Sequence, residues 1–297
     1  MATSRGSDRS SLEGLSVSLV DHVTQALSTI NGGESLVERP GFAYGMGKQE
    51  WSSSGYQGAI KGWDSKRSVH WLSSQVMSPV SLDEEKLNKM VVRPESEAML
   101  DMILRGGAEH DAPHVVFKAK KPIGSTSLKL LLDFIPRRDI VQDLSYYDKY
   151  LKDYVAPQPS SKDGVGCTSA PTDFDMTHSI VTRVVHSPFA CEITIEESKK
   201  QLELAYELGR KHFDRWLQWM SPEEEVSEEE EKDDEESASN VPGEHCEESL
   251  MARVRRDSNL HSLLIEEEKF RLARLFGPDF APDAAPIAEA SVGPDYC

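Results

Sequence analysis

Hydrophobic and polar positions follow a helical period in several parts of the chain. Residues 10–30 carry apolar side chains every three or four positions, which predicts a helix that Asn31, Gly32 and Gly33 end. The strongest helical pattern covers residues 194–220, with Thr194 and Glu197 as its expected cap. Further helical patterns cover residues 82–91, 96–107, 145–154 and 249–277.

Three pairs of segments are instead rich in β-branched and aromatic residues on either side of a short turn-forming link. Such pairs predict antiparallel hairpins. Six strands between helices predict the α/β class, as an α/β/α sandwich whose central antiparallel sheet of about six strands is covered by helices on both faces. The paired segments are residues 56–63 with 68–77, 114–121 with 128–136, and 179–185 with 190–196.

The pattern predicts a single domain over residues 12–277. Residues 1–11 are small, hydroxylated and basic, so we expect a disordered tail or the start of an organelle transit peptide. An acidic run at residues 223–236 holds eleven acids and one lysine, and predicts a disordered loop over 221–248. Residues 278–297 are rich in Pro and Ala and are expected to form a C-terminal tail.

Charge and cysteine usage narrow the function classes. The net charge is −18, and −8 remains outside the acidic run, so binding to duplex nucleic acid is not expected. No apolar run reaches the roughly 18 residues of a membrane span. The four cysteines have no CxxC spacing and no clustered histidines, which favours reduced thiols over a structural zinc site.

Basic residues gather in one part of this acidic chain. Residues 111–155 contain eight basic and six acidic residues. In the predicted strand 114–121, Val116, Lys118 and Lys120 point to the same side. These lysines are either the solvent face of an edge strand or part of a docking patch for an acidic partner. Such a patch would also include Lys121, Arg137, Arg138 and Lys149.

Three further positions carry ionisable groups in unusual surroundings. Asp133 lies in the apolar run LLLDF, so it is either paired, with Arg137 as one candidate, or able to donate protons. His186 precedes a Ser-Pro turn at the end of a predicted strand. Glu266, Glu267 and Glu268 are consecutive on a predicted helix, where side chains point about 100° apart. At least one of the three therefore faces whatever the helix covers.

Taken together, these segments resemble the red chlorophyll catabolite reductase family, whose members are relatives of the ferredoxin-dependent bilin reductases. The resemblance extends over residues 12–280. It is carried by APHVVFK, SLKLLLDFIPRRDIVQDLSYYDKYLKDY, TRVVHSPFACEI and RRD…IEEEKFRLARLFG, in this order around an acidic insert.

The resemblance implies an enzyme that reduces red chlorophyll catabolite, a linear tetrapyrrole, to a fluorescent catabolite in chlorophyll breakdown. It further implies electrons from reduced ferredoxin without bound flavin or metal, a homodimer, and the chloroplast stroma, with the cytosol as the alternative location. A chlorophyll-breakdown oxygenase is a further partner that this context suggests. Ferredoxins are acidic, so the cations of residues 118–152 are the expected docking site for ferredoxin.

The resemblance also assigns site residues. The family motif has two acids in the pocket, and the second falls on Glu267 or Glu268. Lys118 stands at the position of the first acid and is the third candidate catalytic residue; this departure leaves open a non-catalytic bilin-binding protein on the same scaffold. An unrelated acidic scaffold protein whose hairpins match by chance is a further alternative. The expected substrate contacts are Val116, Asp133, His186 and Ser187.

Overall fold

The fold is described from a computed structural model. It describes residues 11–30, 33–39, 50–53, 56–79, 98–122, 125–155, 157, 167–171, 187–221, 244–276 and 281–295.

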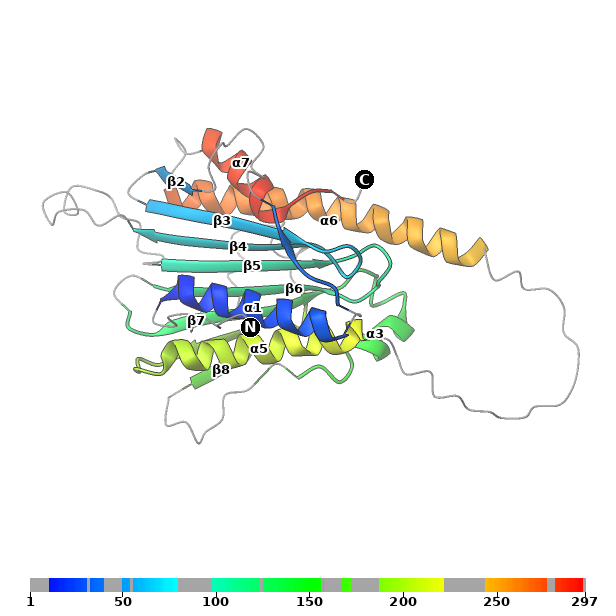
Figure 1. Ribbon diagram of the computed structural model, residues 1–297, viewed down its shortest axis with the longest axis horizontal. Coiled ribbons are helices and arrows are strands. Elements are labelled where there is room, and N and C mark those ends of the chain that lie inside the picture. Colours follow the sequence, from blue (N-terminus) through cyan, green and yellow to red (C-terminus); the bar gives the residue numbers. More distant parts are fainter. Residues whose placement is uncertain are drawn as a thin grey trace, which may run out of the picture.

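One antiparallel sheet runs through the centre of the molecule (Figure 1). Within the described residues it has nine strands in the order β1-β3-β4-β5-β6-β7-β9-β8, with β2 also paired to β3. The predicted fold class is confirmed, and the sheet is wider than expected because the short strands β1, β2 and β8 and the strand β5 extend it. The strands are β1 (Val37–Glu38), β2 (Glu50–Ser53), β3 (Tyr56–Asp64), β4 (Val69–Pro79), β5 (Ala98–Gly106), β6 (His114–Lys121), β7 (Leu128–Ile135), β8 (Cys167–Pro171) and β9 (Cys191–Ile195).

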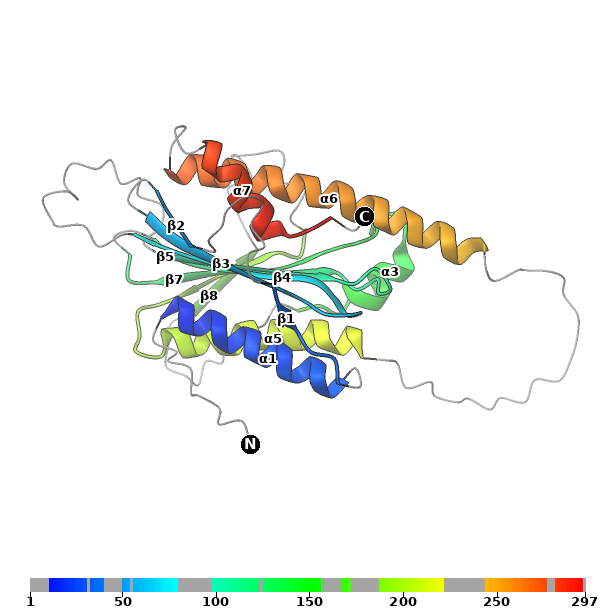
Figure 2. The ribbon, with the colours of Figure 1, turned by 45° about the horizontal axis from the view of Figure 1, so that its top comes forward.

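Helices cover both faces of the sheet (Figure 2). On one face lie α1 (Leu12–Ile30) and α5 (Gln201–Met220), and on the other lie α6 (Glu244–Phe276) and α7 (Ala281–Val292). The short helix α3 (Leu144–Tyr150) follows β7. Asp143 is its N-cap, and the Asp143 carboxylate accepts the Tyr146 N–H at 2.9 Å. Among the residues that the structure describes, no helix is long and apolar enough to cross a membrane.

The main hydrophobic core lies between the sheet and the α1–α5 pair. Leu15, Leu19 and Leu27 of α1 and Phe213 and Trp216 of α5 are fully buried in it. A side chain at Gly209 would place its Cβ 2.8 Å from the Phe117 ring, so this glycine lets α5 approach the sheet closely.

The opposite face has two smaller apolar clusters under α6 and α7. One joins the sheet residues Ile60, Met77 and Met99 to Leu272 and Ile287. The other joins Val116 and Ile135 to Leu260, Leu264 and Val292. Polar side chains lie on the same face of the sheet in the strands between these clusters, and the candidate site is built from them.

Three predictions about elements were wrong. Residues 96–107 were expected to be helical and contain β5, a central strand buried on both faces, which has apolar residues at nearly every position instead of alternating. The helix predicted from residue 194 begins at Gln201, because Cys191–Ile195 pair with β7 and β8. Residues 281–292 of the expected tail form α7, which buries Ile287 and Val292.

Some predicted segments lie outside the described residues. They are the helix at 82–91, the strand at 179–185 and residues 222–243 of the acidic loop; within the remaining part of that loop, α6 already begins at Glu244.

Candidate functional site

A row of polar residues crosses the face of the sheet that α6 covers. The register pairs Gln75 of β4 with Asp101 of β5, and Asp101 with Lys118 of β6. Their neighbours two positions away, Met99 and Val116, pack against α6 and α7, which places the row on the same face. Gln75 and Asp101 are buried, and Lys118 is half-buried.

Two of the three consecutive glutamates of α6 face the protein interior. Glu267 and Glu268 are each only 8% exposed. Glu266 points to solvent, with a side chain that is 63% exposed and accepts a hydrogen bond from Lys269 at 2.9 Å. The helix therefore turns the two glutamates that the family resemblance singles out toward the sheet.

Arg271 connects the helix to the polar row. Its Nη2 lies 2.6 Å from Asp101 Oδ2 and 2.5 Å from Glu268 Oε1, and its Nε donates to Glu268 Oε2 at 2.8 Å. Burial disfavours the charged guanidinium, but Asp101 and Glu268 outweigh this effect and raise the pKa of Arg271. One guanidinium thus holds a carboxylate of the sheet and a carboxylate of α6.

Asp133 of β7 and Ser187, two of the predicted substrate contacts, are hydrogen-bonded to each other. The buried Asp133 carboxylate accepts the Ser187 N–H at 3.1 Å and the Ser187 hydroxyl, and Ser187 Oγ accepts the Phe189 N–H at 3.1 Å. Asp133 therefore fixes the turn before β9. Arg137, one candidate partner of Asp133, binds Asp257 of α6. His186 lies outside the described residues.

Val116 was predicted to contact the substrate. Its side chain is 1% exposed and packs with Ile135 on the sheet and with Leu260 and Leu264 of α6. It belongs to the apolar contact that seats the helix on the sheet, next to the polar row.

The predicted docking patch is divided between the two ends of the β6–β7 hairpin. Lys120 and Lys121 lie at the end of β6, whereas Arg138 and Lys149 follow β7, about 23 Å away along an eight-residue strand. Arg138 donates to Asp143 at 2.9 Å and to Asp111 at 3.2 Å. The cations at the two ends therefore do not form one continuous surface.

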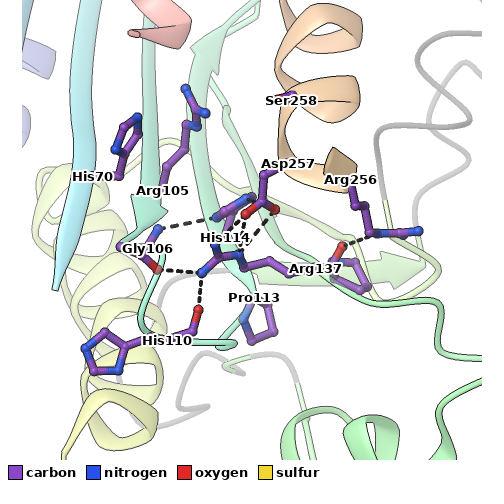
Figure 3. A network of polar contacts seen from close by, with 12 residues as sticks. His70, Arg105, Gly106, His110, Pro113, His114, Arg137, Arg256, Asp257 and Ser258 are labelled. Atoms are coloured by element: carbon purple, nitrogen blue, oxygen red, sulfur yellow. Dashed lines mark hydrogen bonds and ion pairs between the residues drawn. The ribbon is translucent and has the colours of Figure 1, made fainter. Parts of the chain in front are cut away.

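Arg137 is fully buried and cannot lie on an exposed docking surface. Its Nε lies 3.0 Å and 3.2 Å from the two carboxylate oxygens of Asp257 of α6, and its Nη1 donates to the carbonyl oxygens of Gly107, at 2.8 Å, and His110 (Figure 3). Asp257 had not been predicted as the partner of Arg137, because it lies 120 residues further along the chain.

His114 completes this network at the start of β6. Its Nδ1 accepts the Gly106 N–H at 3.3 Å, which leaves the proton on Nε2, 3.3 Å from Asp257 Oδ1. Burial lowers the pKa of His114 to about 4, so the ring is neutral at physiological pH. Although burial disfavours its charge, Asp257 has a lowered pKa, because His114 and Arg137 stabilise the carboxylate. The network ties α6 to the sheet.

Among the described residues, no group of three or more His, Cys, Asp or Glu side chains could hold a metal ion. Asp101, Gln75 and Arg271 had not been predicted as site residues. Asp101 was assigned to a helix, and a correct assignment of β5 as a strand would have placed it opposite Lys118.

The layered fold, one antiparallel sheet between two pairs of helices, is that of a known bilin-binding enzyme structure. A crystal structure of phytochromobilin synthase from tomato in complex with biliverdin matches the fold with a TM-score of 0.54 and 13% sequence identity, over 94% of this chain and 85% of that chain. A sequence model of the family "Red chlorophyll catabolite reductase (RCC reductase)" matches residues 98–284. The chain belongs to this family of oxidoreductases, which act on tetrapyrroles. No curated protein sequence matches the chain.

Proposed function

We propose that the protein reduces red chlorophyll catabolite to a fluorescent catabolite, with electrons from reduced ferredoxin, in the chloroplast stroma and as a homodimer. The observation that carries this proposal is the burial of Glu267 and Glu268 on the helix that covers the polar row, with Glu268 linked through Arg271 to Asp101. These residues all lie within the stretch that matches the reductase family.

The reaction needs proton donors beside the pigment. Reduction of one carbon–carbon double bond takes two electrons, one from each of two ferredoxins, and two protons, and forms two C–H bonds. In this proposal Glu267 delivers a proton from the helix side and water restores the proton afterwards, while Glu268 is paired with the Arg271 guanidinium. Lys118 faces the pigment from the sheet side and, as an ammonium, supplies the second proton or holds a carboxylate group of the substrate.

The geometry supports a narrower set of donors than the sequence alone. Asp133 is held by the Ser187 N–H and hydroxyl, which favours a role in fixing the turn before β9 over proton delivery. The half-buried Lys118 at the position of a family acid favours one alternative, a protein that binds the pigment without reducing it.

Ferredoxin docking is proposed at the turn end of the β6–β7 hairpin. Lys120 is exposed there, Lys121 is half-buried, and Lys129 is directly paired with Lys120 across the hairpin. This end lies at the level of Lys118 and Asp101, so an acidic carrier bound here would approach the site that α6 covers. Arg138 and Lys149 lie at the far end.

The test is an anaerobic assay with reduced ferredoxin and red chlorophyll catabolite, followed by absorbance and fluorescence. Loss of the visible band with a gain of blue fluorescence is the expected result. A shifted band that persists would favour the binding protein, and a spectrum that does not change on mixing would contradict both.

A further inference from the structure

Arg271 forms ion pairs with one carboxylate of the sheet and one carboxylate of α6. It contacts Glu268 three positions earlier on its own helix and Asp101 on β5 with the same Nη2 atom. Its side chain is 18% exposed, and that of Asp101 is 4% exposed. The charged groups that interact with Asp101 or lie opposite it are Lys118 and Lys120 on β6 and Arg271 on α6. Glu267 and Glu268 act on the same Arg271 guanidinium.

Asp101 places a carboxylate on the sheet side of the site. It is the direct cross-strand partner of Lys118, and both side chains are on the face under α6. Side chains directly opposite in an antiparallel pair have Cβ atoms about 5 Å apart. A pigment that reaches Lys118 therefore also comes within reach of Asp101.

We propose that Arg271 is a positioning residue that holds Asp101 and Glu268 in a fixed arrangement, with Asp101 as a third carboxylate facing the substrate. This inference rests on the proposed reductase function. The guanidinium binds the two oxygens of Glu268 through two nitrogens, Nε and Nη2, while Nη2 also contacts Asp101, whereas a lysine has a single nitrogen to offer. Arg271→Lys therefore keeps the charge and removes the two-nitrogen contact that orients Glu268 toward Asp101.

The bridge itself is tested by a double-mutant cycle on the free energy of unfolding, with Arg271→Lys, Asp101→Asn and the double variant. The double variant should lose less stability than the two single losses added together. Arg210 of α5 offers a matched control, since it bridges Glu207 at 2.9 Å and Asp214 at 3.0 Å on the opposite side of the sheet. Arg210→Lys and Asp101→Asn should be additive. Additive losses in the Arg271 cycle would overturn the proposal.

The positioning role is tested by steady-state kinetics with reduced ferredoxin and the red catabolite. Arg271→Lys and Asp101→Asn should each lower kcat about tenfold or more with KM within about threefold, because misplaced groups slow the chemical step more than binding. The double variant should be no slower than the slower single variant, and Arg210→Lys should match the wild type.

The two readouts separate the possible failures. A coupled cycle with an unchanged kcat in Arg271→Lys would overturn the positioning role and leave a structural bridge. If the cycle is coupled but the folded wild-type protein converts no catabolite, the proposed reductase function is overturned, and with it the positioning role of Arg271. The ion-pair bridge would still stand.

Discussion

Arg137, which follows β7, and Asp257 of α6 form an ion pair whose side chains are both fully buried. The pair anchors α6 at one end of the sheet. Glu267 follows Asp257 by ten residues, which is about 15 Å of helix. Because a helix transmits position over this length, the pair helps to fix where the two buried glutamates meet the sheet.

Removal of this anchor should be costly. Arg137→Met leaves the Asp257 carboxylate buried without its cation, and we expect a loss of about 3–5 kcal/mol in the free energy of unfolding, measured with urea. Arg138→Met is the matched control. Arg138 is 32% exposed and pairs with Asp111 and Asp143, so its loss should stay below about 1 kcal/mol. Equal losses in the two variants would contradict this view of the anchor.

Stability should fall in mild acid because of His212 of α5. Burial lowers the pKa of this histidine from 6.5 to about 4. As the pH drops below 6.5, the unfolded chain binds the proton and the folded protein does not, so stability decreases down to about pH 4. The loss is on the order of 3 kcal/mol. Urea unfolding between pH 7 and pH 4 should show this slope, with a smaller slope in His212→Gln. An equal slope in the variant would speak against a buried neutral ring.

Two buried or partly buried glutamines should respond in opposite ways to replacement by methionine. Gln75 Oε1 has no hydrogen-bond partner among the described residues, so Gln75→Met should leave the unfolding free energy unchanged or raise it. Gln201 Nε2 donates to the carbonyl oxygens of Ile195, at 2.9 Å, and Thr126, at 3.1 Å. Gln201→Met should therefore cost about 1 kcal/mol. Thermal or urea unfolding checks both variants. A larger loss of unfolding free energy in Gln75→Met than in Gln201→Met would contradict the view that Gln75 Oε1 is unsatisfied within the described part of the chain.

Charge reversal should distinguish the two ends of the β6–β7 hairpin. Lys120→Glu with Lys121→Glu should slow electron delivery from ferredoxin about tenfold at low salt, with a smaller difference at high salt. Arg138→Glu with Lys149→Glu changes the same number of charges at the other end and should have little effect. Stopped-flow measurements of electron transfer at two ionic strengths decide between the two ends. A slower rate only in the variant with Arg138→Glu and Lys149→Glu would place ferredoxin docking at the other end of the hairpin.

The sequence predicted the layers of the fold but not every element. Hairpins such as β6–β7 were recognised because their strands end at clear turn signals. β5 was mistaken for a helix because AMLDMILR, buried on both faces, lacks the alternation that marks a half-buried strand. α7 was missed because the composition of residues 281–292, with Pro286 inside the helix, resembles a tail.

The part of the candidate site that depends on local sequence spacing was predicted, and the part that depends on long-range contacts was not. The helical spacing of Glu266, Glu267 and Glu268 was enough to indicate that some of them face the sheet. The partners of Asp133 and Arg137 were not predictable, because they are set by tertiary contacts over 54 and 120 residues. Local sequence placed Asp133 and Arg137 four residues apart and so offered each as a candidate partner of the other, whereas Ser187 and Asp257, which bind them, come from distant segments.

The central claim is that the buried glutamates of α6 form the proton-delivering side of a site in which a tetrapyrrole is held against the sheet. The most direct measurement is the rate of loss of the visible band of red chlorophyll catabolite, under anaerobic conditions with excess reduced ferredoxin, for Glu266→Gln, Glu267→Gln and Glu268→Gln. We expect the solvent-facing Glu266→Gln to keep the wild-type rate, and Glu267→Gln or Glu268→Gln to be slower by about 100-fold or more. Wild-type rates in all three variants would contradict the account.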